Sequence, residues 1–117
     1  MDSKELTLNA VKILDNKKAE DIKALMVRDL TIVSDYFIIV SGMSSPHVKA
    51  LADEVDEKLS ALGVKPLRIE GYQEGKWIVV DYGELIIHIF DSKTREFYSL
   101  ERLWADAKPL DLSDIIQ

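Results

Sequence analysis

Two carboxylates lie on either side of a turn between two strand-like segments. Asp81 and Glu84 flank Tyr82-Gly83 within the run 76–90. Paired carboxylates can bind a metal ion or share a proton, but a metal site needs more convergent ligands, and His88 lies farther along the strand. The pair can also tolerate its mutual repulsion at a wet turn, or receive Arg or Lys side chains from a partner. We favour the partner interpretation.

The chain has two histidines, His47 and His88, the residue type that serves most often as a general base. For His88 the sequence predicts no Asp or Ser in a triad arrangement. We therefore predict that His88 packs against Trp77 on a half-buried surface. His47 falls in the first turn of a predicted helix and is expected at the surface.

The turn Ser41-Gly-Met-Ser-Ser-Pro46 leads from a predicted strand into a helix, where free N–H groups can bind a phosphate. The turn lacks the Gly-Lys-Ser/Thr ending and the three-glycine pattern of nucleotide sites. No Asp-x-Asp pair follows at a distance suited to nucleotidyl transfer. A tight turn, with Ser44 or Ser45 as helix cap, is the favoured interpretation. The alternative is a nucleotide-binding or nucleotidyltransferase enzyme that uses the segment 41–46.

The run from Lys76 to Phe90 predicts a β-hairpin, because two β-branched segments flank Tyr82-Gly83. Alternate residues of a strand face opposite sides of a sheet. One side is wholly aliphatic and is expected to face the core: Ile78, Val80, Leu85, Ile87 and Ile89. The other side mixes apolar groups with carboxylates and a histidine: Trp77, Val79, Asp81, Glu84, Ile86, His88 and Phe90. A two-residue turn would pair Asp81 with Glu84, Val79 with Ile86, and Trp77 with His88.

The other elements follow from hydrophobic spacing and from capping residues. Helices are expected from Asp2 or Ser3 to about Asp15, from Pro46 to Gly63, and from Asp91 or Ser92 to Pro109. Further strands are expected at residues 22–27, 36–40 and 67–70, and the wholly apolar 36–40 should be central. The last three strands are joined too closely for helical crossovers, so they include antiparallel pairs. The fold class is therefore α/β, a mixed β-sheet with helices packed on it.

The strand at 67–70 extends the mixed side of the hairpin. Leu67 and Ile69 are expected to point inward, and Arg68 and Glu70 outward. The outward residues would form one contiguous surface that the chain itself leaves uncovered: Arg68, Glu70, Trp77, Val79, Asp81, Ile86 and His88. Such a surface, with Trp77 ringed by acids, suits a basic macromolecular partner.

Composition limits the classes of partner. The 117 residues suit one domain and carry a net charge of −6, with 21 acidic and 15 basic residues. Nucleic-acid affinity comes largely from Lys and Arg, and the sequence has no cluster of them, so we expect no direct sequence-specific nucleic-acid binding. The absence of cysteine excludes disulfides and thiol chemistry. With neither a signal peptide nor a membrane span expected, we predict a cytoplasmic protein without cofactor or metal.

Several segments in this order resemble the Iojap family, the ribosomal silencing factors. The matching segments are 35–45, 48–55, 70–72, 77–90, 94–98 and 100–104. The resemblance covers about residues 5–107 of a single domain 1–117, leaving 108–117 as a tail. Met43 and Pro46-His47 depart from the commoner residues of the family, Thr and Arg-Gln.

The resemblance implies a nucleotidyltransferase-like fold without catalytic carboxylates, hence no enzyme. It implies binding to the large ribosomal subunit through its protein of the L-fourteen type. Joining of the small subunit would then be blocked, and translation repressed in starvation or stationary phase. A homodimer is implied for the isolated protein. The contact residues that the resemblance carries over are Glu70, Trp77, Asp81, Glu84 and His88.

Overall fold

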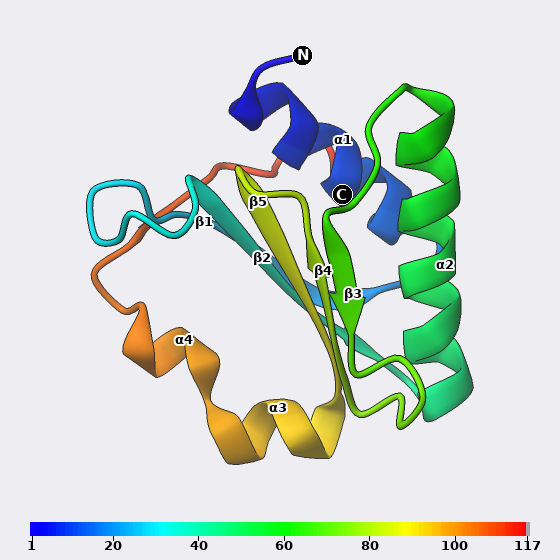
Figure 1. Ribbon diagram of the computed structural model, residues 1–117. Helices are drawn as coiled ribbons and strands as arrows, with labels where there is room; N and C mark the ends of the chain where they lie inside the picture. The colour runs from blue at the N-terminus through cyan, green and yellow to red at the C-terminus, as the bar shows by residue number, and fades with distance from the viewer. Residues whose placement is uncertain (117) are drawn as a thin grey trace.

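A six-stranded mixed sheet in the order β3-β4-β5-β2-β1-β6 forms the centre of the computed structural model, which describes residues 1–116 (Figure 1). Helices pack on both faces of this sheet. The helices are α1 (Ser3–Asn16), α2 (Ser45–Ala61), α3 (Ser92–Tyr98) and α4 (Leu100–Leu103). The strands are β1 (Glu20–Met26), β2 (Tyr36–Gly42), β3 (Arg68–Glu70), β4 (Trp77–Asp81), β5 (Leu85–Asp91) and β6 (Lys108–Pro109). The predicted α/β class with a mixed sheet is confirmed.

The first two helices begin and end where their capping residues predict. Asp2 accepts a 2.8 Å hydrogen bond from the Glu5 N–H at the start of α1. Ser44 accepts one of 3.2 Å from the His47 N–H at the start of α2, and Gly63, with φ of +87°, follows its end. Within residues 1–116, no helix is long and apolar enough to cross a membrane.

Strand β2 occupies the middle of the sheet, as its continuous apolar sequence predicts. It pairs in parallel with β5 on one side and antiparallel with β1 on the other. Every residue of β2 is buried, because helices cover it from above and below. Its burial on both faces explains the lack of alternation in its sequence.

The hairpin of β4 and β5 is formed, but its register differs from the prediction by two residues. Trp77 lies opposite Phe90, Val79 opposite His88, and Asp81 opposite Ile86. The Tyr82 N–H donates to the Leu85 carbonyl, so the two-residue turn is Gly83-Glu84 rather than Tyr82-Gly83. Gly83 has a φ of +84°, as the first central residue of a type II′ turn requires. Because the shift is even, the predicted faces are kept, but Glu84 moves into the turn.

The first face of the sheet packs against α1 and α2. The five aliphatic hairpin residues predicted to face the core all lie in this cluster, with Leu6, Ala10 and Leu14 of α1. From α2 it receives Val48, Leu51, Ala52, Val55 and Leu59. The last residues also pack against this cluster, through Leu110, Leu112, Ile115 and Ile116. Burial of each large side chain contributes about 1.5–3 kcal/mol before entropy is counted, so this face supplies most of the core.

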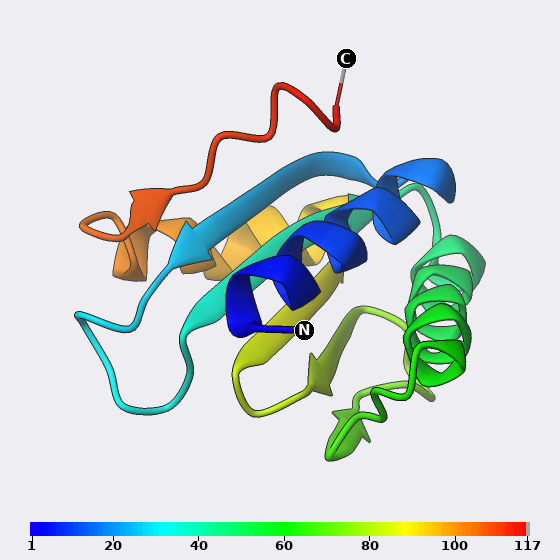
Figure 2. The ribbon, with the colours of Figure 1, turned by 90° about the horizontal axis from the view of Figure 1, so that it is seen from above.

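The second face is not left uncovered, which corrects the prediction. Figure 2 shows α3 and α4 on the side of the sheet opposite α1. Beneath these short helices, Phe90 is fully buried, and Ile86 and His88 are each 8% exposed. The predicted single helix to Pro109 is also wrong. Ser99, with φ of +47°, divides it into α3 and α4, and Pro109 pairs with Leu25 in the sheet.

Strand β3 lies at one edge of the sheet and is short. Arg68 and Glu70 are exposed as predicted, and Ile69 packs against the first cluster. Leu67 was expected to point inward, but it is 71% exposed. Leu67 lies just before β3. Because β3 is the outermost strand, it has a neighbouring strand on one side only. The exposed second face is therefore limited to β3, β4 and their loops.

Candidate protein-binding site

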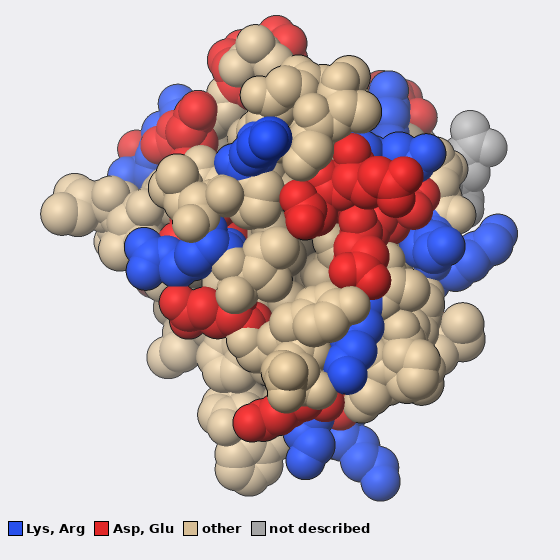
Figure 3. All heavy atoms as spheres, turned by 45° about the vertical axis from the view of Figure 1, so that its right-hand side comes forward, with Lys and Arg blue, Asp and Glu red and all other residues tan. Residues whose placement is uncertain are grey.

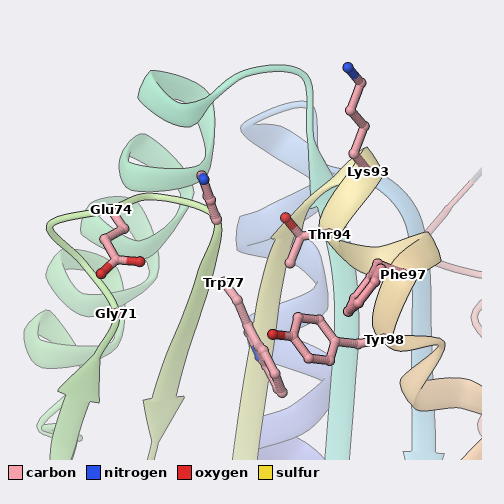
Figure 4. Close-up of a pocket in the computed structure, with 8 residues that line it drawn as sticks. Gly71, Glu74, Trp77, Lys93, Thr94, Phe97 and Tyr98 are labelled. Carbon is pink, nitrogen blue, oxygen red and sulfur yellow. The ribbon is translucent and has the colours of Figure 1, made fainter.

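A groove of about 500 Å³ lies between α3 and the loop that joins β3 to β4. Figure 4 shows Trp77 and the side chain of Tyr98, which points from α3 toward it. Phe97 and Tyr98 are 81% and 52% exposed. The lining residues are Gly71, Glu74, Lys76, Trp77, Lys93, Thr94, Phe97 and Tyr98. Three aromatic rings and a mixed-charge rim give this groove the composition of a protein-binding surface.

Trp77 is held in place by ring contacts and one hydrogen bond. Its indole stacks on Phe90 with centroids 4.9 Å apart and contacts the Tyr98 ring at the same distance. The indole Nε1–H donates to Nδ1 of His88 over 3.2 Å, so the predicted packing of these two residues is confirmed. The indole is half-buried, with α3 beside it. One edge therefore remains accessible to a partner.

His88 lies in the apolar interior of the second face. Its ring meets Phe37 edge-on, with centroids 5.1 Å apart. Since Nδ1 accepts the indole hydrogen bond, the proton of the neutral ring is on Nε2, which is buried and has no hydrogen-bond partner among the described residues. Burial lowers the pKa of His88 from its ordinary 6.5 to about 4. Neutral His88 is thus part of the folded state.

Stability should therefore depend on pH through His88. The unfolded chain takes up a proton below pH 6.5, whereas the folded chain resists it down to about pH 4. The neutral form thus contributes stability above pH 6.5 that is lost as the pH falls toward 4. We expect the free energy of unfolding to drop by about 2 kcal/mol between pH 7.5 and pH 5 from this group. Urea unfolding at several pH values measures it.

The control for this prediction is His88→Gln, which keeps an acceptor for the indole but cannot titrate. Between pH 7.5 and pH 5, its free energy of unfolding should fall by about 2 kcal/mol less than that of the wild type. Comparing the two proteins cancels the pH dependence that does not come from residue 88. Identical pH profiles would show that His88 does not carry the effect.

The carboxylate of Asp81 is used within the chain. One oxygen accepts a 2.8 Å hydrogen bond from the Gly83 N–H, and the other lies 3.2 Å from Nε of Arg68. Arg68 also lies 4.0 Å from Glu70. Asp81 therefore stabilises the turn and the edge strand, a role that the sequence interpretation did not include. Glu84 is exposed at the turn.

The expected ring of acids around Trp77 does not include Asp81. Asp81 is four residues along β4 from Trp77, roughly 13 Å at about 3.3 Å per residue. The charged residues that line the groove are Glu74, Lys76 and Lys93. Within residues 1–116, no group of three or more His, Cys, Asp or Glu side chains could hold a metal ion. The site is therefore an aromatic groove with both signs of charge at its rim.

A buried ion-pair cluster around Arg95 fixes the helix that forms one wall of the groove. Its guanidinium donates from Nη1 to the Asp21 carbonyl over 2.7 Å and to Ser41 Oγ over 3.0 Å. From Nε it donates to Glu101 over 2.7 Å. These contacts join α3 and α4 to β1 and β2. Sequence reasoning missed Arg95, because Arg95 and Glu101 are six residues apart, a spacing that does not bring side chains together on one helix.

The turn Ser41–Pro46 is held by hydrogen bonds within the chain. The Met43 N–H donates to Nδ1 of His47 over 2.9 Å, and Ser44 Oγ caps the helix. Nε2 of His47 lies 2.9 Å from the Lys17 carbonyl, so this partly exposed histidine links α1 to α2. The contacts agree with a structural turn and give the nucleotide alternative no support.

The fold and the groove define an α/β domain whose candidate site is a surface for another macromolecule. The architecture is shared with a crystal structure of a protein from Chromobacterium violaceum. That structure has a TM-score of 0.88 and 34% sequence identity, covering 94% of this chain and 92% of that one.

The chain belongs to the RsfS family, described as ribosomal silencing factor during starvation, whose model matches residues 1–117. It is 35% identical over 116 residues to ribosomal silencing factor RsfS of Halalkalibacterium halodurans, covering 99% of each chain. It is 34% identical over 97 residues to the mouse protein named mitochondrial assembly of ribosomal large subunit protein 1, covering 80% of this chain and 42% of that one. The resemblance stated from the sequence is thereby confirmed, and the family is one of regulators.

Proposed function

We propose that this protein binds the large ribosomal subunit through its protein of the L-fourteen type and sterically blocks joining of the small subunit. Translation is thereby repressed in starvation or stationary phase. The observation that carries this proposal is the match of the whole chain, residues 1–117, to the family of ribosomal silencing factors. The name of the mouse relative, which refers to the large ribosomal subunit, supports the choice of subunit.

The Trp77 groove and the neighbouring edge of the sheet are the proposed contact surface. Trp77 is its anchor, because a half-buried tryptophan beside exposed aromatic rings has the features of an interface hot spot. The exposed or partly exposed members predicted from the sequence are Arg68, Glu70, Val79, Asp81 and Glu84. Ile86 and His88 are buried, so they support the surface from beneath and do not themselves face the partner.

The same aromatic surface is proposed to hold a homodimer when the protein is isolated. Phe97, Tyr98 and Leu103 are large apolar side chains that are more than half exposed. Apolar side chains of this kind gain free energy when a second copy covers them. Sedimentation equilibrium of the wild type and of Phe97→Ser is the test, and a monomer at all concentrations would contradict the dimer.

Sedimentation with purified large subunits tests the ribosomal function. We expect the protein to travel with large subunits and not with small ones. Adding it to an equal mixture of both subunits should lower the yield of joined ribosomes in proportion to its occupancy. Binding without any effect on joining would contradict steric exclusion, and no binding to large subunits would contradict the function itself.

Exposed acids near the proposed surface should affect the rate of association. Reversing charge with Glu70→Lys and Glu84→Lys is expected to slow association with the basic ribosomal protein several-fold at low salt and much less at high salt. Both side chains are exposed, so the fold should tolerate the change. Stopped-flow mixing at several salt concentrations measures it.

The matched control reverses two exposed acids elsewhere, Glu5→Lys and Glu57→Lys, on helices of the first face. It has the same net charge as the test variant. A rate equal to that of the test variant would show that total charge, and not the position of Glu70 and Glu84, governs association. Rates that do not depend on salt would rule out steering.

A further inference from the structure

Five lysines from separate parts of the chain gather at one end of the sheet, where the parallel strands β2 and β5 finish. Lys17 and Lys18 follow α1, Lys49 lies in α2, Lys76 precedes β4, and Lys93 lies in α3. We call these five residues the basic surface. Only Lys17 and Lys18 are close to each other in the sequence, so the sequence shows no basic cluster.

Backbone and side-chain contacts bring these lysines together. The His47 ring, 2.9 Å from the Lys17 carbonyl, joins the end of α1 to the start of α2. Lys49 reaches the loop before β4, where its Cε would lie 3.1 Å from a Cβ added to Gly75. The Asp91 N–H donates to the Lys76 carbonyl over 2.9 Å, which places Lys76 beside the start of α3, where Lys93 lies.

The lysines of the basic surface are accessible to a partner. Four of the lysines are exposed and Lys49 is partly exposed. Every ion pair among the described residues uses an arginine, and none uses a lysine. Figure 4 shows the Lys93 side chain directed away from the groove. Figure 3 shows basic side chains at the lower end of the molecule, beneath a group of acidic ones.

The acids at this end leave a positive excess. Asp91 accepts a hydrogen bond from the Thr94 N–H and so caps α3. Asp21 is paired with Arg95 on the other side of the strand ends, next to Glu20. Glu74, in the loop before Lys76, is the one acid that shares the groove with the lysines. Asp53 accepts a hydrogen bond from Tyr72, the ring that Lys49 covers. Apart from the Arg95 pair, the five lysines are therefore accompanied by four acids, Glu20, Asp53, Glu74 and Asp91, an excess of one positive charge.

We propose that the basic surface contacts phosphates of ribosomal RNA on the large subunit while the Trp77 groove binds the ribosomal protein. This inference rests on the proposed function. Lys76 and Lys93 also line the groove, so the two surfaces adjoin and one docked pose can use both. A chain of net charge −6 is repelled by RNA as a whole, so a local basic surface would also fix its orientation. The contact is to the backbone and reads no sequence.

The test compares two variants of the full chain with equal charge. The first carries Lys17→Gln, Lys18→Gln, Lys76→Gln and Lys93→Gln, and keeps Lys49, whose Nζ lies over the Tyr72 ring. The matched control carries Lys4→Gln, Lys58→Gln, Lys65→Gln and Lys108→Gln, all exposed and outside the basic surface. Affinity for purified large subunits is measured from low to high salt, and affinity for the isolated ribosomal protein of the L-fourteen type is measured in parallel.

The first variant is expected to bind large subunits about 10-fold or more weakly at low salt, with a salt slope smaller by about 1 for each lysine that meets a phosphate. A further variant with Lys17→Gln and Lys18→Gln alone, which lie outside the groove, should bind large subunits more weakly but the isolated ribosomal protein within about 2-fold of the wild type, and the control should behave as the wild type. An unchanged affinity and salt slope, or equal losses for variant and control, would overturn the inference. So would a loss by the Lys17→Gln, Lys18→Gln variant toward the isolated protein equal to its loss toward large subunits.

An additional variant tests whether the loss of binding comes from the loss of charge or from a disturbed fold. Arginine at the same four positions keeps the charge and should retain binding at the wild-type level, while a loss like that of the glutamine variant would overturn the inference. If the wild type itself does not bind large subunits, the proposed function has failed. If it binds and the lysine changes have no effect, the RNA contact alone has failed.

Discussion

Trp77→Ala is expected to weaken binding to the ribosomal protein by about 2–4 kcal/mol, roughly 30- to 1,000-fold. The indole supplies the largest half-buried apolar surface of the groove and is fixed in advance by Phe90, Tyr98 and the hydrogen bond to His88. A prepositioned ring loses little freedom on binding, so most of its contact energy is kept. Titration calorimetry with the isolated ribosomal protein measures the change.

The substitution should also lower stability, because the indole contacts the second-face cluster. The binding measurement therefore requires conditions in which the variant is fully folded. Trp77→Phe is the matched control, since it keeps a ring on Phe90 but loses the Nε1 donor, and we expect a smaller loss of affinity. A folded Trp77→Ala protein that binds as tightly as the wild type would remove Trp77 as the anchor.

Arg95→Met is expected to lower the free energy of unfolding by about 2 kcal/mol, because hydrogen bonds to charged groups are lost while no buried charge is left unpaired. The change removes the donors to Asp21, Ser41 and Glu101 and leaves the buried Ser41 hydroxyl without that partner. Because Asp21 is mostly exposed and Glu101 partly exposed, water can solvate them again, which keeps the loss below the roughly 3–5 kcal/mol of a pair whose remaining charge is buried. Urea unfolding measures it.

Arg102→Met is the control, because Arg102 lies in the neighbouring helix α4 and is exposed. It should change stability by less than about 0.5 kcal/mol. A loss for Arg95→Met as small as that of the control would show that the buried cluster contributes little. If the cluster holds α3 in place, Arg95→Met should also weaken binding at the groove, which Phe97 and Tyr98 of α3 line.

The two faces of the hairpin could be predicted from the sequence even though its turn could not. Alternation alone sorts residues such as Ile78 and Trp77 onto opposite sides, and the observed register differs by two residues, which preserves that sorting. The turn position depends on which residue takes a positive φ. The sequence identifies Gly83 as a turn residue. It does not determine whether Gly83 is the first or the second central residue, because a glycine can occupy either position.

The cover of the second face and the basic surface could not be predicted. A helical pattern runs through Leu100 and Leu103, and serine is not a residue that usually marks a left-handed break, so nothing in the sequence indicates that Ser99 divides the helix. The pairing of Arg95 with Asp21 spans 74 positions. The five lysines likewise meet only through the packing of four segments. Such long-range contacts leave no local pattern.

The left-handed residue Ser99 has a consequence for how the second face is covered. Tyr98 and Trp104 are six positions apart and on one continuous helix would point in directions about 120° apart, at 3.6 residues per turn. Because the chain bends between them, Tyr98 reaches Trp77 and Trp104 reaches Phe37. The covering segment therefore consists of two short helices joined at Ser99, each of which covers a different aromatic side chain of the second face.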